Sequence, residues 1–166
     1  MGNFLSIPIL ALAAILQASI VPQIRILGGG PDLIFLLVLA WAINARLESS
    51  VIWAFVGGIM QDLMSAAPLG TSTVGLLLLV FAISGLGQQV HKIGFIIMLG
   101  LVLFGTLAQQ IIIMLVLAFS GFTMQWGFNL TFVIAPTILY NLVLIWPVYW
   151  FVLRLQRRVS RTGSSV

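Results

Sequence analysis

Long apolar segments, separated only by short turn-forming connections, constrain this chain more than any other feature of its sequence. Only 6% of its 166 residues are charged, whereas about a quarter are charged in a typical soluble domain. So few charges cannot cover a water-facing surface. The apolar runs also lack the alternation of polar and apolar residues that barrel strands require. We therefore expect an all-α integral membrane protein that lies almost entirely within the bilayer.

Six apolar segments can be drawn, each near the roughly 17–25 residues with which an α-helix crosses a bilayer. They are 4–24, 31–46, 50–66, 71–89, 94–119 and 129–153. The connections between them carry turn-forming residues and leave no room for a soluble domain. We expect a single domain of six transmembrane helices over residues 1–153, followed by a short basic cytoplasmic tail over residues 154–166.

The positions of the basic residues predict how the six helices are oriented across the membrane. A short basic tail after a membrane helix favours the anionic cytoplasmic face over a nucleic-acid partner. With six spans and a cytoplasmic C-terminus, Arg46, His91 and Lys92 also fall inside, and Arg25 alone of the basic residues falls outside. The positive-inside rule therefore predicts that both termini are cytoplasmic. The tail arginines are Arg154, Arg157, Arg158 and Arg161.

Groups that could carry catalysis or hold a metal are scarce in this sequence. The chain has no cysteine, which excludes disulfides and thiolate metal sites, and its single histidine excludes a multi-histidine metal site. In the expected topology His91 and the aspartates lie on opposite sides, roughly 30 Å apart across the hydrocarbon core. No Ser-His-Asp set can then form within one chain. We expect no enzymatic activity, no cofactor and no metal.

Two aspartates fall at the ends of apolar segments, both on the expected outer side. Asp32 follows Pro31 at the start of the second segment, where an acid complements the positive end of a helix, so we interpret it as a helix-start residue. Asp62 falls at the other end of its helix, where the macrodipole disfavours a negative charge. Capping does not explain Asp62, so we expect a partner: Arg25, a backbone amide of the following turn, or another protein. We favour a structural contact of Asp62 within the outer loop over a binding site.

Small residues accompany Asp62 on one stripe of its helix. Small residues at a spacing of four let helices approach closely in lipid, so we interpret the stripe as a packing surface. Ala14 and Ala18 repeat the spacing in the first segment. The stripe consists of Ala54, Gly58, Asp62 and Ser65.

Uncharged polar side chains fall within the last two apolar segments. Gln109 and Gln110 lie in the middle of the fifth, and Thr137 and Asn141 form an i, i+4 pair in the sixth. Amides in such positions usually bond to neighbouring helices. Alternatively, Gln109, Gln110 and Asn141 line a polar cavity for a ligand. The sequence does not decide between the two.

The chain resembles the family of rod shape-determining protein MreD. The resemblance rests on the length, the six segments, "PDL" at Pro31–Leu33 and "GGIMQDLMSAAPLG" at Gly57–Gly70. In that family a Gly-rich third span ends in Asp-Leu and a Pro-Leu-Gly turn follows. The matching residues here are Gly57, Gly58, Asp62, Leu63, Pro68, Leu69 and Gly70.

The resemblance implies a non-enzymatic scaffold of the cell-elongation complex in the bacterial cytoplasmic membrane. Its principal partner would be MreC, and through MreC it would couple cytoplasmic MreB filaments to the transpeptidase and glycosyltransferase that build peptidoglycan. It also implies a fold similar to the substrate-binding subunit of energy-coupling-factor transporters. As candidates for a structural or a partner-binding role we single out Asp32, Gly58, Asp62, Pro68, Leu69 and Gly70.

The alternative function is a substrate-binding subunit of a vitamin transporter of that energy-coupling-factor type. Ala14 and Ala18 would then contact the energising partner, and Gln109, Gln110 and Asn141 would line the vitamin pocket.

Overall fold

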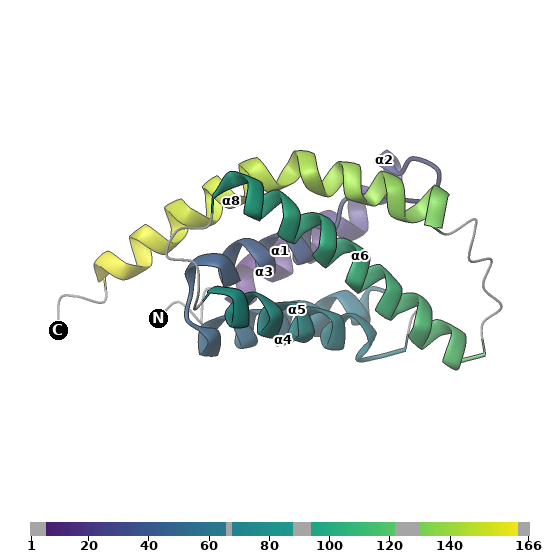
Figure 1. The fold of residues 1–166 in the computed structure, drawn as a ribbon, viewed down its shortest axis with the longest axis horizontal. Coiled ribbons are helices and arrows are strands. Elements are labelled where there is room, and N and C mark those ends of the chain that lie inside the picture. Colours follow the sequence, from purple (N-terminus) through teal and green to yellow (C-terminus); the bar gives the residue numbers. More distant parts are fainter. Residues whose placement is uncertain (1–5, 66–67, 88–93, 122–129, 163–166) are drawn as a thin grey trace.

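The computed structural model describes residues 6–65, 68–87, 94–121 and 130–162, and within these ranges every named element is a helix (Figure 1). The expected apolar segments all contain helices, with bounds shifted by a few residues. The first holds both α1 and the short α2, and the last begins with a π-helical turn, η1. The elements are α1 (Ser6–Ser19), α2 (Val21–Ile24), α3 (Leu33–Asn44), α4 (Leu47–Leu63), α5 (Thr71–Gly87), α6 (Phe95–Phe119), η1 (Leu130–Ile134) and α8 (Ala135–Thr162).

Helix α3 is the centre of the bundle, and α1, α4, α5, α6 and α8 all pack against it (Figure 1). Every side chain from Ile34 to Ala42 is buried. This sequence is apolar on all faces, and a helix of that kind is stable only when protein or lipid surrounds it. Trp41 of α3 stacks on Trp53 of α4, with ring centroids 4.1 Å apart, and its indole N–H donates to Ser49 Oγ at 3.1 Å.

Two helical stretches are long and apolar enough to cross a membrane: Phe95–Phe119 and Phe132–Arg157. Helix α3 has 12 residues, which at a rise of about 1.5 Å per residue is well short of the ~30 Å core. Helix α1 has 14 residues and is also too short, while α4 and α5, with 17 each, are at the lower limit for a span. The structure therefore has the expected all-helical architecture, and the six complete spans remain a prediction.

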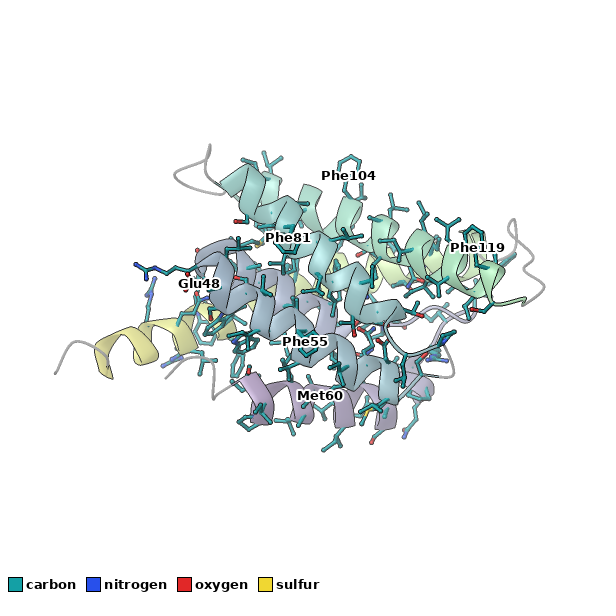
Figure 2. All side chains as sticks on the ribbon, turned by 90° about the horizontal axis from the view of Figure 1, so that it is seen from below. Glu48, Phe55, Met60, Phe81, Phe104 and Phe119 are labelled. Atoms are coloured by element: carbon teal, nitrogen blue, oxygen red, sulfur yellow. The ribbon has the colours of Figure 1, made fainter. Side chains whose placement is uncertain are left out.

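The outer faces of the helices carry large apolar side chains. Phe55, Phe81, Phe104 and Phe119 come from three different helices and point outward (Figure 2). Phe104 is 70% exposed and Phe119 is 90% exposed. Leaving such groups in water would be costly at about 25 cal/mol per Å² of apolar surface. An apolar exterior of this kind suits lipid.

The last helix does not end where the expected domain boundary falls. Helix α8 continues from the apolar segment through the basic region to Thr162, so Arg154 and Arg157 lie on a helix. The Arg154 guanidinium lies 5.0 Å from the centre of the Trp150 ring. His91 and Lys92, which contribute to the predicted topology, lie outside the described residues.

Candidate functional site: two buried carboxylates at one end of the bundle

Asp62 lies in the last turn of α4, and its carboxylate caps the start of α5. One oxygen, Oδ1, accepts from the Ser72 backbone N–H at 2.8 Å. The other, Oδ2, accepts from the Gly70 N–H at 2.8 Å, the Thr73 N–H at 3.3 Å and the Thr73 hydroxyl at 2.8 Å. These backbone groups are among those that a helix N-terminus leaves without intrahelical partners. The side chain is 2% exposed.

The expectation that Asp62 has a partner in the following turn is confirmed, and Arg25 is not that partner. Our reasoning that capping does not explain Asp62 is wrong, because it considered only the helix that carries the residue. The macrodipole of α4 disfavours the charge, while the positive end of α5 favours it. Asp62 is thus a cap supplied by the preceding helix.

Gly58 lies one turn before Asp62 and lets α5 approach α4. A Cβ added at Gly58 would overlap the Cα, Cβ and hydroxyl oxygen of Thr73. Thr73 therefore both packs on Gly58 and donates to Asp62. Ala54 is also buried, which agrees with a packing stripe, whereas Ser65 lies beyond the end of α4 and is exposed.

The Pro-Leu-Gly turn joins these two helices. The Pro68 carbonyl accepts from the Thr71 hydroxyl at 2.7 Å and from its backbone N–H at 3.3 Å. Gly70 has φ +98°, a left-handed conformation that glycine adopts without strain. Leu69 is 74% exposed. The turn thus holds an apolar side chain outward beside the Asp62 cap.

Asp32 is the N-cap of α3, as expected, and its carboxylate is also the centre of a buried polar cluster. Its Oδ1 accepts from the Phe35 backbone N–H at 3.0 Å. Three glutamine side chains from α1, α4 and α6 also donate to the carboxylate: Gln17 at 3.4 Å, Gln61 at 2.8 Å and Gln109 at 3.4 Å. The cluster therefore ties three helices to the start of the central one. Pro31 directly precedes this cap and lies outside α3.

Asn141 extends the cluster to α8. Its Oδ1 accepts from the Asp32 backbone N–H at 3.0 Å, and its side-chain amide donates to the Thr106 hydroxyl at 3.1 Å. Asn141 is fully buried and Gln109 is 3% exposed. Gln110 is only partly buried, and the hydrogen bond to Asp32 from this part of α6 comes from its neighbour Gln109. The sequence singled out Gln109 and Asn141 but left two interpretations open, and the contacts seen here are those of bonds between helices.

Gln17 and Gln61 are the members of the cluster that sequence reasoning missed. Both are amides inside apolar segments, which is the signal that singled out Gln109. Gln61 stands directly before Asp62 in the sequence.

The hydrogen bonds of this arrangement hold helices together. Within the described ranges, no group of three or more His, Cys, Asp or Glu residues could hold a metal ion. Neither aspartate is paired with a cation there; amide and hydroxyl donors satisfy both carboxylates.

An apolar exterior over a largely apolar core, in which the few buried polar side chains are hydrogen-bonded, is typical of a helical membrane protein. The model of one protein family, rod shape-determining protein MreD, matches residues 1–159. The chain therefore belongs to the MreD family, whose role is in determining rod shape and which is not a known enzyme family. Comparisons with curated proteins and with solved structures gave no match.

Proposed function

We propose that this chain is a non-enzymatic scaffold of the bacterial cell-elongation complex, with MreC as its principal partner. In this role it helps couple cytoplasmic MreB filaments to the transpeptidase and glycosyltransferase of peptidoglycan synthesis. It lies in the cytoplasmic membrane as a six-span protein with both termini in the cytoplasm. Membership of the MreD family and the charge distribution support this proposal.

The observation that carries the proposal is the way in which Asp62 fixes the turn from Pro68 to Gly70. Binding residues are often found on loops that a rigid scaffold positions. Here the scaffold is the α4–α5 pair. The two helices approach closely at Gly58, and Asp62 caps the start of α5. Leu69 is exposed on the turn, and we propose that it contacts MreC.

Co-purification tests this contact. The chain and MreC are expressed together, and the amount of MreC retained per scaffold is measured in detergent for wild type, Leu69→Ser and Ile96→Ser. Ile96 is also an exposed apolar residue, at the start of α6, and serves as the matched control. We expect Leu69→Ser to lower MreC retention roughly tenfold, a change of ~1.4 kcal/mol, and Ile96→Ser to leave it unchanged. Equal retention by all three would refute the proposed contact.

The structure gives the transporter alternative less support. Ala14, half of the proposed contact with an energising partner, is 1% exposed and packs in the core of this chain. Gln109 and Asn141 bond within the Asp32 cluster. These residues are already occupied by contacts inside the protein.

A further inference from the structure

Helix α8 ends in a basic stripe on the side that faces away from the bundle. On the opposite side Val152 is fully buried, and the side-chain amide of Gln156 donates to the Trp41 carbonyl of α3 at 3.2 Å. The basic end of α8 also projects beyond the other helices (Figure 1). By helical spacing, the positions on the stripe are Trp150, Leu153, Arg154, Arg157, Arg158 and Arg161.

A cavity of about 360 Å³ opens along this stripe, and its wall includes Trp150, Leu153, Arg154 and Arg157. The Arg154 guanidinium lies 5.0 Å from the centre of the Trp150 ring, where a cation is attracted to the face of the ring. A ring contact uses the charge and the face of a guanidinium, whereas a phosphate binds to its in-plane N–H groups. Trp150 can therefore hold Arg154 in place while Arg154 binds an anion.

The position of the cavity along α8 matches the surface of a membrane. The apolar stretch that is long enough to cross a bilayer runs from Phe132 to Arg157. Arg154 lies roughly 33 Å along the helix from Phe132, at about 1.5 Å per residue, and so falls at the edge of the ~30 Å hydrocarbon core. Tryptophan is common at this level, where the lipid headgroups begin. A phospholipid thus carries its phosphate at the level of these arginines.

The charge of the stripe favours a lipid with a net negative charge. Four arginine positions fall on the stripe, whereas the chain has no Asp or Glu after Asp62. Of the three acids of the chain, only Glu48, in the first turn of α4, belongs to this end of the bundle. A zwitterionic lipid would bring its own cation among the arginines, and an anionic lipid would not. Basic clusters beside a membrane helix attract anionic lipids for this reason.

We propose that Trp150, Arg154 and Arg157 form a binding site for the phosphate of an anionic phospholipid. Arg154 binds the phosphate through its fork of N–H groups, Trp150 holds the guanidinium in place, and Arg157 adds a second positive charge. The inference goes beyond the scaffold function, because it assigns a lipid ligand to the protein, and its test requires no protein partner.

The test uses the full chain in detergent, stripped of lipid and then mixed with dioleoyl phosphatidylglycerol or dioleoyl phosphatidylcholine. Native mass spectrometry measures the bound lipid, and we expect about tenfold more phosphatidylglycerol than phosphatidylcholine on the wild type. Arg154→Lys keeps the charge but loses the planar fork, and Trp150→Leu removes the ring, so each should lower phosphatidylglycerol binding roughly fivefold. The matched controls, Arg46→Lys and Trp146→Leu, replace exposed residues that do not line the cavity and should bind as the wild type does.

Attraction by the total charge of the tail would give a different pattern. In that case Arg154→Lys would bind phosphatidylglycerol as the wild type does, and this result would overturn the proposed site. Equal binding of the two lipids by the wild type would also overturn it, and would leave an acidic protein segment as the occupant of the stripe. Inorganic phosphate is the soluble probe: bound lipid that resists it supports a lipid site, and complete displacement contradicts one. Arg154 and Trp150 are both exposed, so these substitutions should not disturb folding.

Discussion

At the scale of single residues, Asp62 shows how a charge can be buried in an apolar bundle without a counter-ion. Removing a carboxylate from water is costly. Four donors from residues 70–73 compensate, three of them backbone N–H groups at the start of α5. Charge-assisted bonds of this kind are roughly twice as strong as neutral ones. The same bonds determine where α5 begins.

Replacing Asp62 with alanine should therefore destabilise the protein. Asp62→Ala leaves buried N–H groups without acceptors, and we expect the free energy of unfolding to fall by about 1–3 kcal/mol. Reversible unfolding in mixed micelles with increasing dodecyl sulfate measures this change. Glu48→Ala is the matched control, because Glu48 is an exposed acid in the first turn of the same helix. Its removal should lower the free energy of unfolding by less than about 1 kcal/mol. An Asp62→Ala protein as stable as the control would contradict the capping role.

At the scale of elements, the α4–α5 pair forms the part of the fold that supports the turn. Gly58 removes the side chain that would separate the two helices at Thr73, and Asp62 bonds to the same residue one turn later. Packing and capping thus depend on one another at Thr73.

Even a single methyl group at Gly58 should disturb this contact. In Gly58→Ala the added Cβ meets the α5 backbone, which cannot move aside as a flexible side chain can. We expect a loss of about 1–3 kcal/mol in the free energy of unfolding, measured in the same micelles. Gly100→Ala places the same methyl in open space on α6 and should stabilise the helix by up to ~1 kcal/mol. Similar effects of the two substitutions would show that close approach at Gly58 is unimportant.

The positions of the helices could be predicted from the sequence because each apolar run is bounded by turn formers. The cap at Asp32 could also be predicted, since it depends only on residues three apart. The cluster around Asp32 could not. It joins residues up to 109 positions apart, and their meeting depends on how each helix is rotated about its axis, which an apolar run does not specify. The capping of α5 by Asp62 could also have been predicted, because the acid lies only a few residues before the turn that leads into α5.

At the scale of the whole molecule, a largely apolar core contains one cluster of buried polar side chains, and the exterior is apolar. Buried amides meet the Asp32 carboxylate at the start of α3, while exposed phenylalanines lie on the outer faces (Figure 2). A short central helix surrounded by longer ones is stable in lipid because its neighbours, and not the bilayer, cover it. Both carboxylates lie at the same end of the bundle, since Gln61 bonds to one and adjoins the other. The proposed topology makes that end periplasmic.

Single cysteines can test this orientation, because the chain has none of its own. We expect Leu69→Cys to react with a membrane-impermeant maleimide in cells whose outer envelope is permeabilised while the cytoplasmic membrane stays intact. Arg46→Cys should react only after the cytoplasmic membrane is permeabilised. Labelling is read as a mass shift of the purified chain. The reverse pattern would show that the topology is inverted.

The central claim is that Asp62 fixes a turn from which Leu69 contacts MreC. Site-specific photo-crosslinking in living cells tests it most directly, with the photoreactive residue at position 69 or, as a control, at position 96. The account predicts an adduct with MreC from position 69, its loss when Asp62→Ala is added, and no adduct from position 96. An adduct from position 96 but not from 69, or one from position 69 that Asp62→Ala leaves unchanged, would contradict it.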